Sequence, residues 1–296
     1  MSVSLVAVTL IKNEADIILA SLNNLYGLGI NMFAIMDNDS SDKTMEQIHQ
    51  FRFLHDNANV LIVQDYEKNH CQSRKVTALA KMAAAYFSAT HVYPFDADEF
   101  LRPVGIAASS GANLLAEIDV AAVSLRWRTC MLGAEGELYM CKAYSSSSFN
   151  KTLVRWGPDV TINEGNHSAS YERTNWRGRT KRKTFSAKVL SGYEVLHVPV
   201  RSAEQLRTKI LNGAAANSVN RNTNTALHWT TLHQVYLQNG ETFFQEFFNM
   251  LQRGAESEFA AFCLAQRVKR EHLCYFNDYF LPRTCAEIDL GIIEAS

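Results

Sequence analysis

The chain lacks several features that would narrow its function at once. Its six cysteines are widely scattered, with no CxxC pair and no cluster of cysteine and histidine, so neither a zinc site nor a disulfide framework is expected. We therefore predict reduced thiols and a cytoplasmic location. The 29 basic and 30 acidic side chains leave a net charge of −1, which gives no reason to expect nucleic acid as a partner.

Long apolar runs are also missing. No segment approaches the ~20 consecutive apolar residues that a membrane-spanning helix requires. The apolar stretch at residues 2–11 has no basic stretch before it and no small-residue cleavage site after it, so it is not predicted to be a signal peptide. We expect no transmembrane segment, and peripheral contact at the inner face of a membrane stays open.

Strand and helix patterns alternate regularly through the first hundred residues. Short apolar, β-branched runs are followed by amphipathic segments of helical length. This alternation predicts βαβ units, and therefore an α/β fold with a Rossmann-type, mainly parallel sheet flanked by helices. Strands are expected at 3–11, 31–36, 59–64 and 90–95, and helices at 14–28, 43–54 and 73–88.

The remainder of the chain has a different organisation. Residues 121–128 and 186–199 have strand patterns, whereas the last hundred residues favour helices. We expect the first half of the sheet domain at 1–125, the rest of the sheet with its loops at 126–202, and a helical C-terminal region at 203–296. Helices of this last region are predicted at 203–212, 226–238, 242–251 and 259–270.

Polar clusters near Asn13, Asp37 and Asp96 each follow a predicted strand. Ligands of parallel α/β sheets bind beyond the carboxyl ends of the strands, so these clusters predict a shared site. Asp96 and Asp98 have the spacing at which two side chains of an extended segment point the same way, and Glu99 follows them. This pattern suits Mn²⁺ or Mg²⁺, which usually also binds phosphate oxygens. A solvated turn at the end of the strand is the alternative.

Together these segments resemble a family 2-type glycosyltransferase of the GT-A fold. More narrowly, the chain is similar to the bacterial branch whose first strand ends in Asn-Glu and whose metal motif reads Asp-x-Asp-Glu-Phe. The resemblance is clear over roughly the first hundred residues, is weaker at 186–210, and does not cover the helical tail. The segments that carry it are VAVTLIKNEAD at 6–16, MDNDSSDKT at 36–44 and FDADEF at 95–100.

The resemblance implies a nucleotide-sugar donor that binds to the region 1–125, with its nucleoside over the first two strand ends. Asp37 or Asp39 would accept a hydrogen bond from the base or ribose, although both also suit an ordinary turn before a helix. Arg74 would face the diphosphate, or else lie in a solvated helix start. The residues that match donor-contacting positions are Thr9, Asn13, Glu14, Asp37, Asp39, Arg74 and Asp96.

The resemblance also implies a metal site and a catalytic base. Asp98 would be the main metal ligand, Asp96 would lie near the ribose or the metal, and His197 would complete the metal shell unless it is a structural histidine. An inverting transfer needs a base for the proton of the acceptor hydroxyl. Glu164 is the first candidate, with Asp159 and Glu99 behind it, and a surface turn is the alternative for the segment 163–167.

Six lysines and arginines lie at 173–183, around Trp176. This run predicts a solvated loop, a mobile loop that closes over the diphosphate, or a site for an anionic acceptor such as a phospholipid-linked or acidic glycan.

We therefore predict a metal-dependent, inverting glycosyltransferase. It would move a sugar from a nucleotide-sugar donor to a glycan, a lipid-linked acceptor or another hydroxyl-bearing acceptor. A sugar-phosphate nucleotidyltransferase would need a glycine-rich, basic loop after the first strand, but the segment KNEAD at 12–16 has no glycine and is acidic. A non-catalytic carbohydrate- or nucleotide-binding relative is the other alternative, although the intact acids at 96, 98 and 99 argue against it.

Overall fold

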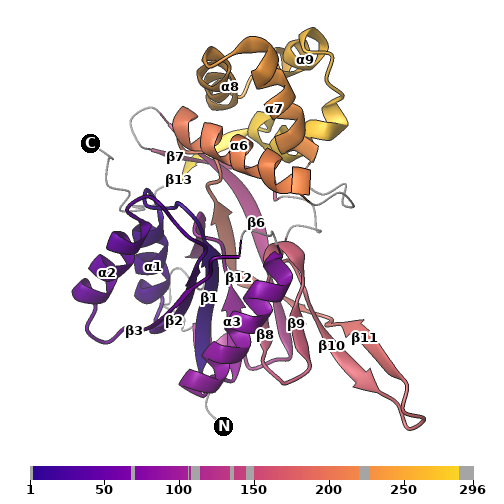
Figure 1. Ribbon diagram of the computed structural model, residues 1–296. Helices are drawn as coiled ribbons and strands as arrows, with labels where there is room; N and C mark the ends of the chain where they lie inside the picture. Colours follow the sequence, from indigo (N-terminus) through magenta and orange to yellow (C-terminus); the bar gives the residue numbers. More distant parts are fainter. Residues whose placement is uncertain are drawn as a thin grey trace. The chain divides into compact units, whose positions relative to one another are not determined.

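The chain divides into two compact units (Figure 1), and each is described by itself. Unit 1 comprises residues 1–127, 145–197 and 289–296, and unit 2 comprises residues 128–144 and 198–288. The computed structural model describes residues 3–67, 71–105, 107, 114–133, 137–144, 150–219 and 227–286.

Unit 1 begins with a parallel sheet in the strand order β3-β2-β1-β4, flanked by three helices. The predicted α/β fold is therefore confirmed, and the predicted strands and helices of this half all form. They are β1 (Leu5–Ile11), α1 (Ile18–Gly27), β2 (Met32–Asp37), α2 (Thr44–Leu54), β3 (Asn59–Gln64), α3 (Gln72–Phe87) and β4 (His91–Pro94).

The periodicity of α3 explains how one face of this sheet is covered. Val76, Leu79, Ala80 and Ala83 are spaced at three and four residues, so they share one side of the helix, and all are buried. They pack in one cluster with side chains of β1 and β2, including Val8. The small alanines allow the helix to lie close to the sheet.

Beyond β4 the sheet continues with antiparallel pairs. β8 (Lys151–Arg155) pairs with β4 and with the first part of β6 (Ala122–Leu132). β5 (Glu99–Pro103) pairs with β12 (Lys188–His197). The expected strands near 121–128 and 186–199 are present, whereas β5 and β8 were not predicted.

A smaller sheet in unit 1 has the strand order β11-β10-β9. It consists of β9 (Val160–Ile162), β10 (Ala169–Thr174) and β11 (Thr180–Thr184), and a short 3₁₀ turn, η2 (Glu164–Asn166), lies between β9 and β10. β10 and β11 form a hairpin that extends away from the larger sheet of the unit (Figure 1). The basic run at 173–183 is therefore the greater part of a β-hairpin and not an irregular loop.

Unit 2 is mainly helical. The predictions at 203–212, 226–238 and 242–251 are confirmed as helices, but the one at 259–270 has the wrong bounds, because α9 ends earlier and a 3₁₀ segment follows. The elements are α6 (Ala203–Val219), α7 (Leu227–Asn239), α8 (Thr242–Arg253), α9 (Glu256–Ala265) and η3 (Arg270–Phe280), with β7 (Leu138–Cys141) paired to the end of β6 and to β13 (Arg283–Ala286).

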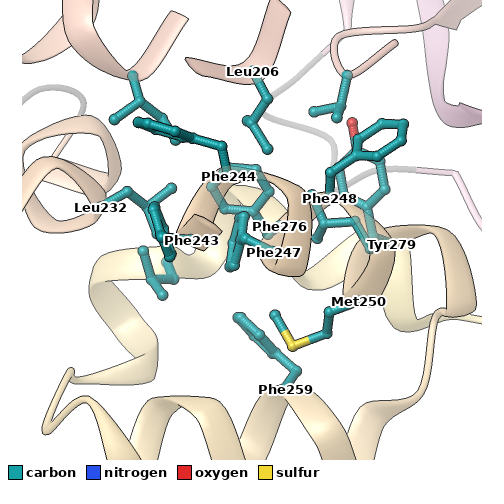
Figure 2. Close-up of a cluster of buried hydrophobic side chains, with 14 of the residues drawn as sticks. Leu206, Leu232, Phe243, Phe244, Phe247, Phe248, Met250, Phe259, Phe276 and Tyr279 are labelled. Atoms are coloured by element: carbon teal, nitrogen blue, oxygen red, sulfur yellow. The ribbon is translucent and has the colours of Figure 1, made fainter. Parts of the chain in front are cut away.

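An aromatic core holds unit 2 together (Figure 2). Phe243, Phe244, Phe247 and Phe248 of α8 are all buried, at the spacing of one helix face. Phe247 contacts the ring of Phe276 edge to face, with ring centroids 5.3 Å apart. Burial of each such ring stabilises the unit by roughly 1.5–3 kcal/mol. Among the described helices, none has the length and apolar character needed to cross a membrane.

Candidate functional site

The three polar clusters lie at neighbouring strand ends. β1 and β2 are parallel, with Ile11 opposite Asp37, and β4 is parallel to β1 on its other side. The backbone N–H of Phe95 continues this pairing by donating to the carbonyl of Val8 at 3.0 Å. The residues after each strand are therefore brought to the same edge of the sheet, as the sequence predicted.

Asn13 and Glu14 connect the first two clusters by hydrogen bonds of their backbone and of the Asn13 side chain. Asn13 has a positive φ of 55°, which a short polar side chain tolerates. Its N–H donates to Ser40 Oγ at 2.9 Å, and its Oδ1 accepts from the N–H of Ser41 at 2.8 Å. The N–H of Glu14 donates to Thr44 Oγ1 at 2.8 Å. These bonds fix the loop after β1 against the loop after β2.

Asp37 at the end of β2 is 2% exposed. Its Oδ2 accepts from the N–H of Ser40 at 3.3 Å, while its Oδ1 is buried without a hydrogen-bond partner in the described part of the chain. The same holds for Oγ1 of Thr9, which is fully buried. A buried polar atom without a partner is costly, so Asp37 is suited to a ligand that donates a hydrogen bond. Asp39 is exposed, with a φ of 58°.

Arg74 and Lys75 at the start of α3 differ sharply in environment. Arg74 is 61% exposed and forms a surface ion pair with Glu67. Lys75 is 5% exposed, and its Nζ lies 2.6 Å from Asp65 Oδ2 and donates to the carbonyl of Glu67 at 2.6 Å. Asp65 also accepts from Asn38 Nδ2 at 2.9 Å. The pair of Lys75 and Asp65 therefore joins the first turn of α3 to the end of β3, and Asn38 joins Asp65 to the end of β2, a role that the sequence did not predict.

The third cluster contains a buried lysine that the sequence analysis missed. Lys151 begins β8 and is 1% exposed. Its Nζ lies 2.5 Å from Asp96 Oδ2 and 2.9 Å from Glu99 Oε1, and donates to the carbonyl of Gly165 at 2.9 Å. Burial lowers the pKa of Lys151, but the two carboxylates outweigh it, so its net pKa is raised. Burial raises the pKa of Glu99, because the charge of Lys151 offsets its desolvation only in part and Asp96 repels it.

The loop at η2 closes over Asp96. Asn166 Nδ2 and Gln72 Nε2 donate to Asp96 Oδ1 at 3.0 and 3.4 Å, and the N–H of Gly165 donates to Gln72 Oε1 at 3.1 Å. Gly165 and Asn166 have positive φ values of 70° and 60°, which allow this tight turn. Oδ1 of Asn166 is buried without a partner in the described residues. Like Oδ1 of Asp37, this oxygen can accept a hydrogen bond from a ligand, here beside Asp96.

Glu164 lies in the same loop but is exposed. Its Oε1 accepts from the N–H of Ser73 at 3.3 Å, at the first turn of α3. Glu164 and Arg74 line the same open depression, about 580 Å³ in volume, together with Ser73 and Thr77. The structure therefore brings two of the predicted residues, the candidate base and the candidate diphosphate contact, to one surface.

Asp98 and His197 also meet. His197 ends β12 opposite Glu99, and its Nε2 lies 3.5 Å from Asp98 Oδ1. The ring of Trp127 packs against His197, with centroids 4.3 Å apart, and against His167 at 5.5 Å. His167 Nδ1 donates to a backbone carbonyl at 3.2 Å. Burial, with the charge of Lys151, lowers the pKa of His167 to about 4, so its imidazole is neutral at neutral pH.

Two of the three predicted metal ligands are thus brought together. The carboxylate of Asp98 and the imidazole of His197 are close enough to bind one ion, and this pair of donors fits Mn²⁺ or Mg²⁺ whose other ligands come from phosphate and water. The third predicted ligand, Asp96, has Lys151 as its partner, which neutralises its carboxylate. Within the described residues, no group of three histidine, cysteine, aspartate or glutamate side chains is arranged for a metal.

Asp159 is not part of this site. It is exposed in the turn after β8, beyond Arg155, which pairs with His91 at the start of β4. Because β8 runs antiparallel to β4, this turn lies at the edge of the sheet opposite to Asp96. Asp159 was predicted as a candidate base without β8, the strand whose direction determines the position of this residue.

Comparisons with known proteins give distant likenesses only. No family model and no curated protein matches the chain. Among solved structures, the mannosyltransferase PcManGT from Pyrobaculum calidifontis, in complex with GDP-Man and Mn²⁺, is 14% identical, with 94% of this chain and 84% of that chain covered and a TM-score of 0.43.

Two further solved structures cover less of this chain. Residues 1–349 of S. aureus TarS, in complex with UDP, are 14% identical over 71% of this chain, with a TM-score of 0.37. This chain spans 65% of that fragment, less than two thirds of its length. GalNAc-T7 with UDP, GalNAc and Mn²⁺ is 8% identical over 64% of this chain and 30% of that chain, with a TM-score of 0.30.

Proposed function

We propose that the chain is a metal-dependent, inverting glycosyltransferase of the family 2 type, which uses a nucleotide-sugar donor. The observation that carries the proposal is the meeting of three groups at one edge of the parallel sheet. They are the buried carboxylate of Asp37 with an oxygen that has no partner, the neutralised carboxylate of Asp96, and the pair of Asp98 and His197. A nucleoside diphosphate needs hydrogen-bond acceptors for its nucleoside and a cation for its phosphates, and these groups supply the first and are suited to hold the second.

The nucleoside part of the donor would lie at the ends of β1 and β2. Oδ1 of Asp37 accepts a hydrogen bond from the base or the ribose, which removes the cost of its burial. The loops that carry Asn13, Glu14 and Asp39 are held together by hydrogen bonds, so they form a prearranged wall for the nucleoside. Thr9 supports this wall from within the sheet.

The diphosphate would lie beyond β4. Asp98 and His197 are the residues that would hold the ion, and a bound Mn²⁺ or Mg²⁺ supplies a Lewis acid for the diphosphate leaving group. Arg74 is exposed and paired only at the surface, so it is free to exchange Glu67 for a phosphate oxygen. Asp96, fixed by Lys151 and Asn166, orients the ribose or the sugar through its exposed edge.

The base would be Glu164. In the transfer, the acceptor oxygen bonds to the anomeric carbon, the bond from that carbon to the phosphate oxygen breaks, and the acceptor proton moves to the base. Glu164 is exposed in the loop over Asp96 and, among the described residues, accepts one weak hydrogen bond. Glu99 is buried and paired with Lys151, so we assign it a structural role.

The acceptor would be a glycan, a lipid-linked saccharide or another hydroxyl-bearing molecule. All six cysteines are free thiols, which is compatible with a reaction in the cytoplasm. We further propose that the protein associates peripherally with the inner face of a membrane.

The test begins with donor binding. Calorimetry of the purified chain with UDP, GDP, CDP and dTDP should reveal one preferred nucleoside diphosphate, bound at least tenfold more tightly with Mn²⁺ than with a chelator. Asp37→Asn should weaken this binding, whereas Asp56→Asn in the exposed turn after α2 should not. The corresponding nucleotide sugars, with an acceptor extract, should then release nucleoside diphosphate.

Two outcomes would decide against the proposal. If none of the nucleoside diphosphates binds with Mn²⁺ present, the assignment fails. Binding without release from any nucleotide sugar would favour the non-catalytic relative instead.

A further inference from the structure

The hairpin of β10 and β11 concentrates positive charge. Between Ala169 and Thr184 there are six lysines and arginines and one glutamate, a net charge of +5, although the whole chain has a net charge of −1. The remaining residues are therefore net acidic. The hairpin projects from the larger sheet of unit 1 (Figure 1), so this charge is presented on a protruding element.

The two faces of the hairpin are unlike. In an antiparallel pair, directly opposite residues point to the same face. On one face Glu172 is opposite Arg182, and Thr174 is opposite Thr180, with their Oγ1 atoms 2.9 Å apart. Arg182 also donates to Asn163 at 2.7 Å. On this face Arg182 and the two threonine hydroxyls have hydrogen-bond partners within the protein, and the one glutamate of the hairpin lies opposite an arginine.

The other face is cationic without compensation. Arg173 is directly opposite Lys181, and Tyr171 is opposite Lys183. The three cations are exposed, and in the ranges that the structure describes none of them forms an ion pair. Like charges in opposite positions destabilise a hairpin. An anionic surface that covers this face would remove the repulsion between Arg173 and Lys181 and stabilise the strand pairing.

The tip of the hairpin presents a tryptophan in a well-formed turn. Asn175 Oδ1 accepts from the N–H groups of Arg177 and Arg179, both at 3.0 Å, and Gly178 supplies the positive φ of 72°. Trp176 is 86% exposed, and the guanidinium of Arg177 lies 4.4 Å from its ring centroid. An aromatic ring held outward among cations is the combination that binds at the headgroup level of a bilayer.

We propose that this hairpin docks the protein on an anionic phospholipid surface, with the Trp176 ring at the headgroup level and Arg173, Lys181 and Lys183 against the lipid phosphates. A bilayer needs to touch only the protruding hairpin. An extended polyanion such as a nucleic acid would also lie along the rest of the chain, which is net acidic and would repel it. The docking does not depend on the proposed glycosyl transfer.

The experiment is cosedimentation of the full chain with vesicles at low salt. Vesicles of phosphatidylcholine with 30% phosphatidylglycerol should bind the protein, and vesicles of pure phosphatidylcholine should not. The reason is that each cation near an anionic surface increases the affinity about fivefold. Arg173→Gln with Lys181→Gln should weaken binding more than tenfold. The control, Arg52→Gln with Lys269→Gln, makes the same charge change on exposed side chains outside the hairpin and should bind as the wild type.

The aromatic contribution is tested in the same way. Trp176→Ala should weaken binding, whereas Phe53→Ala, which removes an equally exposed ring from α2, should not. The tryptophan emission of the wild type should shift to the blue on vesicle binding, and Trp176→Phe should abolish the shift.

Several results would overturn the inference. They are equal binding to both kinds of vesicle, wild-type binding by the Arg173 and Lys181 double variant, or tighter binding to a single-stranded oligonucleotide or to heparin than to the anionic vesicles. Nucleoside diphosphate binding, measured on the same variants, should be unchanged, which separates this inference from the proposed function.

Discussion

The ammonium of Lys151 lies 2.5 Å from the carboxylate of Asp96, the first acid of the motif for which the sequence predicted a metal. A lysine thus supplies the positive charge that this acid requires. The same ammonium lies 2.9 Å from Glu99, so one buried cation compensates two carboxylates that would otherwise repel each other.

Substitution of Lys151 should lower the free energy of unfolding substantially. Lys151→Met leaves Glu99 buried without its partner, and removal of one member of a buried ion pair costs about 3–5 kcal/mol in the free energy of unfolding. The matched control is Arg155→Met on the same strand, whose ion pair with Asp119 is exposed and contributes about 1 kcal/mol or less. Urea unfolding followed by circular dichroism measures both. Equal stabilities of the two variants would contradict the structural role of Lys151.

Asp98 and His197 should both be required for the effect of Mn²⁺ on nucleoside diphosphate binding. Asp98→Asn and His197→Gln should each weaken the Mn²⁺-dependent binding of nucleoside diphosphate by roughly 10–100-fold, because each removes a ligand of the ion. Asp159→Asn makes the same chemical change at the opposite edge of the sheet and should leave binding unaltered. Calorimetry with and without Mn²⁺ compares the three variants. A defect of similar size in all three would argue against a metal at this pair.

Glu164 should affect turnover and not donor binding. If it removes the proton of the acceptor, Glu164→Gln should lower kcat by roughly 10²–10⁴-fold. The affinity for nucleoside diphosphate should stay within about twofold of the wild type, since the partner of this side chain in the described part of the protein is the N–H of Ser73. Single-turnover assays with the identified donor separate these quantities. If Glu164→Gln keeps the wild-type kcat, another residue must act as the base.

Two partly buried histidines should make the fold sensitive to acid. Burial lowers the pKa of His167 and of His228 to about 4, whereas both titrate near 6.5 in the unfolded chain. The unfolded state therefore binds more protons between these values, so stability is complete above pH 6.5 and falls as the pH is lowered towards 4, by up to about 3 kcal/mol for each histidine. Unfolding measured between pH 4 and 7 should lose part of this dependence in His167→Asn, and another part in His228→Phe.

The aromatic core of unit 2 should tolerate truncation poorly. Phe247→Ala removes a ring that is 1% exposed, and such changes cost about 3–5 kcal/mol. Phe53→Ala removes an exposed ring and should change stability by less than about 0.5 kcal/mol. Thermal unfolding compares the two variants. A small effect at Phe247 would mean that neighbouring rings refill its space.

The sequence predicted secondary structure most accurately where consecutive residues of an element, or one face of it, are buried. β1, with the sequence LVAVTLI, is almost wholly buried, and the spacing of the alanines in α3 marks one helix face, so pattern and structure agree. β11, with the sequence TKRKT, is exposed throughout and has no apolar alternation, so its residues gave no sign of a strand. Only its pairing with β10 makes it one.

The candidate site was predictable in part for a related reason. Asp37, Asp96 and Asp98 follow recognisable strands, which is why they were found. Lys151 was missed because its significance comes from the pairing of β8 with β4, a contact between residues far apart in sequence. The local signal for Lys151 in the sequence is its position directly before a short strand-like segment, Thr152 to Val154.

The position of Lys151 in the chain has a consequence for synthesis on the ribosome. Asp96 and its cation are separated by 55 residues, and the loop at η2 that closes over Asp96 follows later still. At about 5–20 residues per second, the parallel half of the sheet is made seconds before its charges are balanced. The nascent strands β1 to β5 therefore emerge with Asp96 and Glu99 uncompensated, and we expect this half of the protein to complete its folding only after β8 has left the exit tunnel.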